Sequence, residues 1–510
     1  WARALRLDRV GVHDNFFELG GDSIITLQIA ARAAQAGLAI TPVQLFKHAT
    51  IAELAAVAAK AEAPRAEQGP IAGVVTLTPA QLWYLEVSRN GAEPWSQSIT
   101  LDLTERVDAA ALEQALQQLR AQHDALRLHV RTEGVEGGIV SAWLPEHLID
   151  PILRPFDLRA LAPEDRPGAT ARLRAALNAA CDPERGRLIG AALVETGAQQ
   201  QLVLVVHHLA VDGVSWWALL QDLETALAGG ALPAKTTSVR AWGERLRAYA
   251  VAEAEQHLPF WRAQAARLPR DAHPASIEAE TRALRVSLDA TETGRLLQGV
   301  VPMHEALLAA VVDSAGSREL TVMLEGHGRE PIFGDADLSR TVGWFTGIYP
   351  LALRAGRDSA ETVRLTQAAL KSVPQHGLDF GVLRYLGAPD HRAVLAGPAP
   401  LLLVNYLGQL DGLTYDSTRF TVAEGLNLVR SAEARRPYAV ELNARVEGGR
   451  LELDWTFSPE LAEHVTGWAA TTAERLRRLI ATPSGVSVSA ADVSADELGD
   501  ILAEFAEESP

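Results

Sequence analysis

The sequence has a single cysteine, Cys181, among 510 residues. A disulfide within the chain is therefore excluded, and the scarcity of cysteine fits a reducing compartment, so we expect a cytoplasmic protein. Long apolar runs are also missing, because no stretch approaches the roughly 18 consecutive apolar residues that suggest a transmembrane helix. We therefore predict that no segment spans a membrane.

Positive charge is scarce as well. Lysine and arginine contribute 47 residues against 64 aspartates and glutamates, which gives a formal net charge of −17. A surface of this sign repels phosphate, so we expect neither a nucleic-acid partner nor binding to an anionic membrane. The few lysines lie in no motif typical of a pyridoxal Schiff base. Glycine-rich phosphate loops are absent too, so nucleotide binding has no support.

The remaining composition is that of globular protein, with 48% hydrophobic and 22% charged residues. A length of 510 residues corresponds to about three domains of typical size. The chain begins with Trp1, and no targeting leader follows it. We therefore expect a segment of a longer polypeptide that contains several domains.

The hydrophobic pattern divides the chain into a small helical unit and two larger mixed units. Residues 1–60 have apolar residues at helical spacing, whereas residues 61–73 are polar and contain proline and glycine without any period, which is typical of a linker. From residue 74 onward, strands alternate with long helices. We predict two α/β lobes, at 74–270 and 271–495, that face one another.

Several elements inside these lobes are predicted by periodicity alone. The expected elements are helices at 109–126, 214–228 and 459–482, strands at 201–207 and 319–324, and a hairpin from 439 to 457 that turns at Glu447-Gly-Gly-Arg450. The motifs that carry chemistry lie mostly at the ends of such strands.

The first chemical motif is Gly20-Gly-Asp-Ser23, which opens a predicted helix. Alone, this pattern also fits an N-cap serine that satisfies a free backbone amide. A phosphodiester at the same position would face the positive end of the helix dipole. Within a helical unit at residues 1–60, the motif resembles the peptidyl carrier domain of nonribosomal peptide synthetases. The resemblance implies that Ser23 carries 4′-phosphopantetheine, attached by a phosphopantetheinyl transferase.

His207 and His208 stand where a predicted strand passes into a helix, in the string Val206-His-His-Leu-Ala-Val-Asp-Gly213. Consecutive strand residues point to opposite faces, so these imidazoles cannot easily share a metal, and no third ligand has suitable spacing. Two interpretations are left: a buried core histidine, or an acid–base histidine at the mouth of a cleft. The string resembles the His-His-x-x-x-Asp-Gly motif of the condensation superfamily, to which chloramphenicol acetyltransferase is related. On that resemblance His208 is the functional residue, His207 supports it, and Asp212 braces the loop.

Three strings in the second lobe distinguish among members of that superfamily. They are Leu324-Glu-Gly-His-Gly-Arg-Glu330, Arg340-Thr-Val-Gly-Trp-Phe-Thr-Gly-Ile-Tyr-Pro350 and Val404-Asn-Tyr-Leu-Gly-Gln409. Taken singly, they fit a turn with an exposed Glu325–Arg329 ion pair, a buried aromatic strand and another turn. In this order after the histidine pair, they resemble the epimerization domain of nonribosomal peptide synthetases. Condensation domains usually lack the first and third strings.

Other features bear on this resemblance. Thr78–Tyr84 and Pro374–Gly381 are similar to further motifs of the epimerization domain, and the Gly-Gly-Asp-Ser form of the carrier motif commonly precedes such domains. The sequence departs from the family pattern at Leu209-Ala-Val211, Pro331 and Val404. None of these positions carries a group that we expect to react.

The resemblance implies a small all-α four-helix carrier bundle followed by two chloramphenicol acetyltransferase-like α/β lobes, which form a V with a cleft between them. It also implies inversion, from L to D, of the α-carbon of an aminoacyl or peptidyl thioester held on Ser23. Inversion requires an acid–base group on each face of the α-carbon, and we assign these roles to His208 and Glu325. An alternative role for His208 is to stabilise an enolate as an imidazolium.

Supporting roles fall to further residues of these motifs. We expect Asn405 and Tyr406 to orient the substrate carbonyl and Arg340 to be structural. A cleft of low dielectric should raise the pKa of Glu325. We expect no metal site and no cofactor beyond the pantetheine arm. Cys181 lies outside every motif, and we interpret it as a structural or incidental thiol.

The alternative function is that of a condensation domain, which joins two carrier-bound substrates by a peptide bond. That reaction needs a second carrier, whereas the sequence holds one carrier motif. A noncatalytic member that only recruits partners is a third interpretation. The expected partners are an upstream adenylation domain and a downstream condensation domain or module. Residues 496–510 have apolar residues at helical spacing and fit either a closing helix or an acidic docking helix for the next synthetase.

Overall fold

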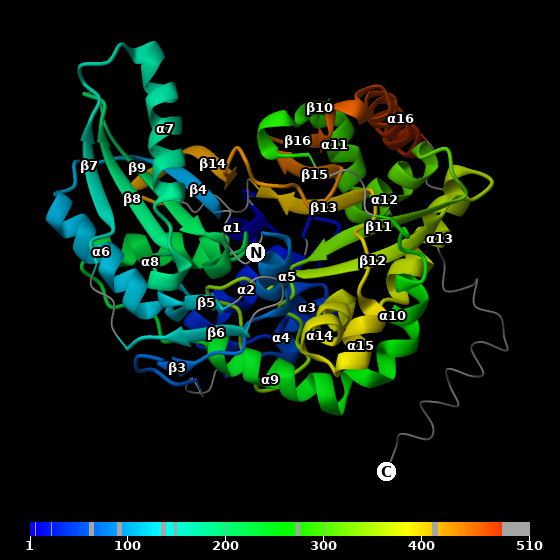
Figure 1. The fold of residues 1–510 in the computed structure, drawn as a ribbon, viewed down its shortest axis with the longest axis horizontal. Helices are drawn as coiled ribbons and strands as arrows, with labels where there is room; N and C mark the ends of the chain where they lie inside the picture. Colours follow the sequence, from blue (N-terminus) through cyan, green and yellow to red (C-terminus); the bar gives the residue numbers. More distant parts are fainter. Residues whose placement is uncertain are drawn as a thin grey trace.

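In the computed structural model, the chain forms a small N-terminal helical domain and a body of two lobes (Figure 1). The predicted docking segment at 496–510 lies outside the described residues. Within the described residues, no helix is long and apolar enough to cross a bilayer. The structure describes residues 1–5, 7–21, 23–60, 66–88, 94–133, 139–146, 150–197, 199–271, 276–299, 301–410 and 417–481.

The N-terminal helical domain has a hydrophobic core of its own. Its elements are α1 (Ala2–Leu5), α2 (Ser23–Gln35), β1 (Leu38–Ala39), α3 (Pro42–Lys47), α4 (Ile51–Val57) and β2 (Ala59–Lys60). Helices α3 and α4 begin with capping boxes, in which Thr41 and Thr50 each accept a hydrogen bond from the backbone three residues later. Phe16 and Leu54 are buried at the centre of the core. This arrangement matches the predicted helical unit and adds a short two-stranded pairing to it.

The first lobe is built on a five-stranded sheet of order β14-β4-β9-β8-β7. Its strands are β4 (Trp95–Leu103), β7 (Leu153–Asp157), β8 (Ile189–Glu195), β9 (Gln200–His207) and β14 (Phe420–Arg430). Its helices are α6 (Ala109–Gln122), α7 (Arg166–Ala179) and α8 (Ser215–Leu227). Helices α5 (Pro79–Val87), α9 (Val239–Ala252) and α10 (Leu258–Ala265) also precede the predicted division at residue 270, but they pack against helices and a strand of the second lobe.

Strand β9 is apolar at nearly every position because both of its faces are covered. Val203 and Val205 join a cluster with Leu177 of helix α7. Leu204 and Val206 point to the other face and join the main core. An unbroken apolar run is what such a doubly covered strand requires. The predicted strand at 201–207 is thereby confirmed.

A small three-stranded sheet completes the first lobe. It has the order β3-β6-β5, and its strands are β3 (Gly73–Val74), β5 (His129–Glu133) and β6 (Ile139–Leu144). Ile71 is buried just before β3. The end of the predicted linker therefore packs into the lobe.

The second lobe contains a six-stranded sheet of order β10-β16-β15-β13-β11-β12. Its strands are β10 (Arg282–Leu288), β11 (Glu319–Gly326), β12 (Gly347–Arg354), β13 (Leu402–Gln409), β15 (Val440–Glu447) and β16 (Arg450–Phe457). Its helices are α11 (Ala290–Leu297), α12 (Met303–Ser314), α13 (Ser359–Lys371), α14 (Leu378–Leu386), α15 (Pro389–Leu395) and α16 (Ala462–Ala481). Strand β13 runs parallel to both of its neighbours, β11 and β15.

One strand crosses between the lobes. Strand β14 follows β13 of the second sheet along the chain, yet it pairs antiparallel with β4 of the first sheet. In Figure 1 the two sheets stand to the left and right like the arms of a V, and β14 lies with the left sheet. The first sheet thus takes a strand from beyond the predicted division at residue 270.

Most predicted elements agree with the structure, and one differs. The predicted helices at 214–228 and 459–482 correspond to α8 and to α16 with a preceding 3-10 turn, and the predicted hairpin is β15–β16. The predicted helix at 109–126 instead ends at Gln122, and residues 124–127 form a 3-10 turn. His123, whose Nε2 is 2.9 Å from Asp222 Oδ2, stands at this break.

Candidate active site

His207 is a buried structural residue. It ends β9, and its Nδ1 accepts the backbone amide hydrogen of Leu209 at 3.1 Å. Its Nε2 therefore carries the proton and donates to the Tyr84 hydroxyl at 3.2 Å. Burial, with the neighbouring His208, lowers the pKa of His207 to about 3. With both nitrogens engaged, His207 orients the turn that presents His208.

His208 opens the 3-10 turn after β9, and its Nε2 lies 3.1 Å from Nε2 of Gln97 on strand β4. The other end of this amide, Gln97 Oε1, accepts from the indole of Trp216 at 2.8 Å. Because an indole can only donate, the amide nitrogen must face the imidazole and donate to it. His208 therefore presents Nε2 as an acceptor and carries its proton on Nδ1. Gln97 was not among the predicted site residues, because it stands in no sequence motif.

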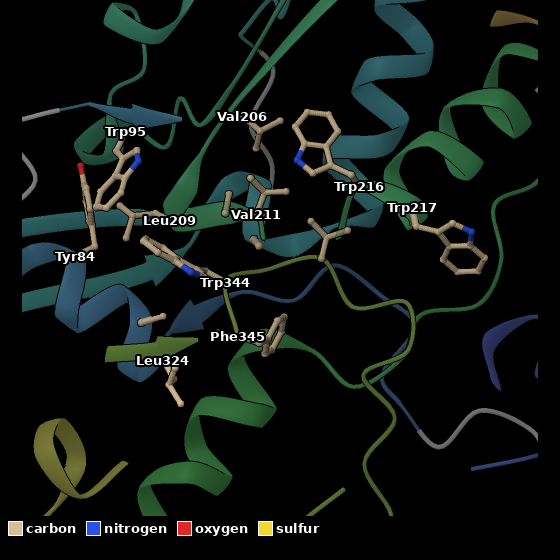
Figure 2. Close-up of a cluster of buried hydrophobic side chains, with 14 of the residues drawn as sticks. Tyr84, Trp95, Val206, Leu209, Val211, Trp216, Trp217, Leu324, Trp344 and Phe345 are labelled. Carbon is tan, nitrogen blue, oxygen red and sulfur yellow. The ribbon is translucent and has the colours of Figure 1, made fainter. Parts of the chain in front are cut away.

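His208 is enclosed by aromatic rings. The centroid of the Trp344 ring lies 3.7 Å from that of the imidazole, and the Trp95 ring lies 5.9 Å away. In Figure 2 the Trp344 ring lies between Leu209, beside His208, and Leu324 of strand β11. Burial lowers the pKa of His208 to about 4, although the charge of Asp212 opposes the shift. A neutral imidazole near pH 7 is the result.

Asp212 joins the histidine loop to the second lobe. Its Oδ1 accepts hydrogen bonds from the Ser215 hydroxyl at 2.7 Å and from Arg329 Nη2 at 2.8 Å. Its Oδ2 accepts from the Phe345 amide at 3.2 Å. Arg329 is buried, and its guanidinium lies 4.4 Å over the Phe345 ring. The exposed Glu325–Arg329 ion pair considered for the isolated string is therefore wrong, since Arg329 pairs with Asp212 instead.

The Glu-Gly-His-Gly-Arg string turns tightly at Gly328. This residue has φ +65°, and a Cβ there would lie 1.6 Å from the carbonyl oxygen of Phe345. Only glycine fits such an approach. The turn brings Arg329 back toward the histidine loop while Glu325 stays at the end of β11.

Helix α5 holds both sides of the site. The Thr78 hydroxyl donates to the carbonyl oxygen of Trp344 at 2.7 Å. The Gln81 side chain donates to the carbonyl oxygen of Leu209 at 2.6 Å. The motif at Thr78–Tyr84 therefore positions the two segments that enclose His208.

Glu325 is the carboxyl group that the second lobe presents near this site. Its Oε2 accepts a hydrogen bond from Asn405 Nδ2 at 2.8 Å, between the adjacent parallel strands β11 and β13. Protein surrounds the carboxyl closely, although some of the residue stays accessible. Burial, reinforced by the charge of Glu441, raises the pKa of Glu325 to about 7, and the charge of Arg430 opposes this shift. Burial and a neighbouring negative charge thus raise the pKa of Glu325 in the direction that the sequence predicts.

The other predicted supporting residues differ in position. Asn405 contacts Glu325, so it orients the carboxyl group. Tyr406 stacks against His304, with ring centroids 6.4 Å apart. Arg340 donates to Asp222 Oδ1 at 2.5 Å and lies 5.5 Å over the Trp217 ring, within a buried cluster of the first lobe. These contacts are what the predicted structural role of Arg340 requires, and that role stays a prediction.

The loop before helix α2 contacts the body of the protein. Gln409, at the end of strand β13, donates a hydrogen bond from Nε2 to the carbonyl oxygen of Gly20. The Arg32 guanidinium of α2 lies 5.9 Å from the Trp217 ring of α8, and Ala31 is part of the main core. The helical domain is therefore docked on both lobes, with the start of α2 beside the strand that carries Asn405.

The glycine turn before α2 suits a serine-borne phosphate. Gly20 has φ +90°, and a Cβ on Gly21 would lie 2.3 Å from the Phe16 ring. Helix α2 begins at Ser23, so the backbone amides of its first turn point to that position. The side chain of Ser23 itself lies outside the described part of the chain. Among the described residues, no group of three or more potential ligands could hold a metal ion.

Comparison with known families gives the relationship of both domains. The family model described as "Condensation domain" matches residues 71–498, and that described as "Phosphopantetheine attachment site" matches residues 1–58. The chain belongs to the condensation-domain family. It carries in front a domain of the phosphopantetheine attachment family, so 4′-phosphopantetheine is its prosthetic group. The predicted didomain of a nonribosomal peptide synthetase, with its carrier and its two-lobed fold, is confirmed.

Relatives of this condensation-family chain are parts of long synthetases. A linear gramicidin synthase protein of Brevibacillus parabrevis is 40% identical over 496 residues, which cover 91% of this chain and 9% of that protein. Tyrocidine synthase 1 of the same organism is 31% identical, over 90% of this chain and 45% of its own length. The chain thus spans less than half the length of these relatives.

Solved structures support the same fold. The epimerization domain from the third module of tyrocidine synthetase B is 26% identical and superposes with a TM-score of 0.70, covering 82% of this chain and 98% of that one. The first condensation domain of the calcium-dependent antibiotic synthetase has a TM-score of 0.60 at 21% identity, covering 81% of this chain and 97% of that one, and shows the shared fold alone.

Proposed function

We propose that this protein inverts the α-carbon, from L to D, of an aminoacyl or peptidyl thioester held on 4′-phosphopantetheine at Ser23. The observation that carries the proposal is a pair of titratable groups, His208 and Glu325, that come from different lobes. The charge of one residue, Arg430, lowers the pKa of both, so the two groups share one electrostatic environment. The likeness to an epimerization domain of tyrocidine synthetase B supports the same reaction.

The pKa values indicate which group acts as the base and which as the acid. His208, with a pKa of about 4, rests as a base near pH 7, whereas Glu325, with a pKa of about 7, is half protonated there. Two groups whose environments separate their pKa values in this way are suited to act as base and acid. Peptide-bond formation needs no second proton-handling group on the opposite face of the α-carbon. A buried, amide-held Glu325 therefore favours inversion.

The proposed step moves one proton to His208 and another from Glu325. The pantetheine arm supplies a thioester, whose carbonyl oxygen can accept negative charge. His208 Nε2 takes the α-proton, and the electron pair of the C–H bond forms the C=C bond of an enolate. Protonated Glu325 then delivers its proton to the opposite face of the α-carbon, and the C=O bond forms again. When a D-isomer is inverted to L, Glu325 takes the α-proton and protonated His208 delivers one. This restores the starting protonation of both groups.

The resting site constrains the approach of the substrate. Nε2 of His208 accepts the amide hydrogen of Gln97. This amide must therefore move away before the α-carbon of the substrate can approach Nε2. Asn405 holds Glu325 through a single hydrogen bond and thereby fixes the direction of its other oxygen. Asn405 thus positions the acid, rather than the substrate carbonyl as sequence analysis expected.

The docked carrier supports the same reaction. Asn405 and Gln409 lie four residues apart on β13, and a β-bulge between them keeps their separation below the roughly 13 Å of an extended strand. Gln409 contacts the carbonyl oxygen of Gly20, three residues before Ser23. Loading of this serine by an upstream adenylation domain, and transfer to a downstream condensation domain or module, complete the proposed sequence of partners.

The test uses the full chain, on which a phosphopantetheinyl transferase transfers L-aminoacyl-4′-phosphopantetheine from the corresponding aminoacyl-coenzyme A to Ser23, with adenosine 3′,5′-bisphosphate as the leaving group. After incubation in deuterium oxide, the thioester is hydrolysed, and the chirality and mass of the amino acid are measured. We expect D-isomer that carries one deuterium, loss of both signals in His208→Ala, and loss of the D-isomer in Glu325→Gln. Glu305→Gln is the matched control, because Glu305 is also a partly buried carboxyl held by an amide, Gln367, at 2.7 Å. Full activity in Glu325→Gln would show that the assignment is wrong.

Peptide-bond formation is the second candidate, because the matching family model is that of condensation domains. It predicts no deuterium uptake by the loaded chain alone. Addition of an aminoacyl acceptor carrier would then give a dipeptide that depends on His208. Deuterated D-isomer without dipeptide would exclude this candidate.

A further inference from the structure

Arg430 is a buried arginine that no motif of the sequence contains. It is the last residue of β14, directly opposite Trp95 of β4 in the sheet register. Its guanidinium carbon lies 3.8 Å from the centroid of the Trp95 ring, and its side chain is 6% exposed. Together with Trp95 and Val87, it lines a small cavity. The crossing strand thus carries a cation to the aromatic wall beside His208.

Two nitrogens of Arg430 donate no hydrogen bond to the described residues. Its Nη1 lies 3.6 Å from Glu441 Oε1 and 3.8 Å from Glu278 Oε2, which is within ion-pair distance. Neither contact is a hydrogen bond, and Nε and Nη1 have no hydrogen-bond partner among the described residues. Arg436 instead makes the hydrogen bonds to both carboxylates. Ion pairs with the two carboxylates hold Arg430 in place, and its Nε and Nη1 keep hydrogens that no described residue accepts.

Unpaired polar atoms gather around this guanidinium. Buried polar groups without a partner are rare in folded proteins, so a group of them at one place indicates a site for a polar ligand. The buried atoms of this neighbourhood without a hydrogen-bond partner in the described chain are Nδ1 of His208, Nε1 of Trp95, Nε1 of Trp344, the Tyr438 hydroxyl, Oε1 of Glu441, Nε of Arg436, and Nε and Nη1 of Arg430. Two of these residues are cations. Arg436 donates hydrogen bonds to the two carboxylates, whereas Arg430 lies over the Trp95 ring.

The charge of Arg430 reaches both proton-handling groups. The guanidinium lies over the Trp95 ring, whose centroid is 5.9 Å from that of the His208 ring, and its charge lowers the pKa of both His208 and Glu325. Once His208 has taken the α-proton it is an imidazolium, but its new N–H faces the α-carbon. The enolate oxygen therefore needs a separate donor, and Arg430 offers one.

We propose that Arg430 donates hydrogen bonds from Nε and Nη1 to the thioester carbonyl oxygen of the substrate and stabilises the enolate oxygen during inversion. This inference rests on the proposed function. When the α-proton leaves, the charge on that oxygen grows from partial to full. The guanidinium then gains an ion pair that the neutral substrate does not offer, so the interaction is stronger in the transition state.

The experiment compares Arg430→Gln and Arg430→Lys with the unsubstituted chain, in the single-turnover rate of deuterium uptake at the α-carbon. Removing one oxyanion donor typically lowers a rate by about 10²–10³-fold, and we expect Arg430→Gln to fall in this range. Arg430→Lys should recover at least about tenfold, because it restores the charge without the planar fork. The alkaline limb of the pH–rate profile should move upward in Arg430→Gln, because the Arg430 charge lowers the pKa of Glu325.

Arg120→Gln is the matched control, because Arg120 is a buried arginine of helix α6 that bonds the carbonyl oxygen of Asp150, and it has no contact with this site. We expect it to keep the rate and the pH profile. If thermal unfolding shows that Arg430→Gln is not folded, the test rests on Arg430→Lys alone. We then expect the rate of deuterium uptake to fall by about tenfold. Unchanged rates in the folded Arg430 variants overturn the inference while inversion stands. Absence of inversion in the unsubstituted chain refutes the proposed function and this inference with it.

Discussion

Glu441 is the residue whose charge tunes Glu325, and its removal gives a quantitative test of the site. Glu325 stands on β11 and Glu441 on β15, the two strands that flank β13. Neighbouring strands lie about 4.8 Å apart, and Glu441 stands two residues along β15 from the position level with Glu325, so the two residues are about 12 Å apart. At that distance and an effective dielectric of about 20, two unit charges interact by about 1.4 kcal/mol. This energy corresponds to about one pKa unit.

Glu441→Gln removes the charge and keeps the shape of the side chain. The pKa of Glu325, raised to about 7 in the native site, should fall by about one unit. The substitution also deprives Arg430 of a counter-charge, and that effect acts in the same direction because Arg430 lowers the pKa of Glu325. Both consequences of the change therefore move the carboxyl group toward easier ionisation.

The assay is the single-turnover rate of deuterium uptake as a function of pH. The active pair holds one proton between His208 and Glu325, so the profile should be a bell with limbs near pH 4 and pH 7. We expect Glu441→Gln to move the alkaline limb to about pH 6. Glu447→Gln, at the exposed end of the same strand, is the control. An alkaline limb that stays in place or moves upward would refute the assignment of Glu325.

Three further predictions concern stability and docking. The raised pKa of Glu325 lowers the stability of the fold as pH rises above the unfolded value of about 4.5 and through about 7. Glu325→Gln should therefore increase the free energy of unfolding by about 3 kcal/mol at pH 8 and leave it unchanged at pH 4, in chemical denaturation. Asp212→Ala should lower the free energy of unfolding by about 3–5 kcal/mol, because it leaves the buried Arg329 charge without its partner. Gln409→Ala removes a hydrogen bond to Gly20 worth about 1 kcal/mol, so inversion on the docked carrier should slow by about fivefold, whereas inversion of a free aminoacyl-pantetheine thioester should not change.

Each of these predictions has a control in the chain. Glu319→Gln, at the exposed start of β11, should show no stabilisation between pH 4 and pH 8. Asp335→Ala breaks an exposed ion pair with Arg245 and should change stability little. Gln199→Ala, remote from the carrier, should leave both rates unchanged. Equal effects in a variant and its control would contradict the corresponding prediction.

The residues with a motif of their own were predictable from sequence, because each motif combines a chemical group with a backbone requirement. His208 follows a strand that must be apolar on both faces, and Glu325 precedes a glycine turn that admits no side chain at Gly328. The boundaries of α8 and of the β15–β16 hairpin follow in the same way from periodicity and from the two glycines at the turn.

The partners of these residues were not predictable, because they are set by contacts between distant parts of the chain. Arg329 pairs with Asp212 across the lobes instead of with nearby Glu325. Gln97 and Trp95 stand on β4 without any motif around them, and only the fold brings them to His208. Arg430 reaches the site because β14 leaves its own lobe, which no local pattern in the sequence indicates.

The path of β14 also limits how the protein can be divided. A shortened gene that ended after the first lobe would leave β4 as an edge strand, with nine residues that contain a single charged side chain, Asp102. Such a flat and nearly uncharged edge invites pairing with other chains, so the fragment should aggregate. Recombination between synthetases that preserves this domain must therefore exchange both lobes together. Because of this crossing strand, the two lobes must fold together, and their coding sequences must be inherited together.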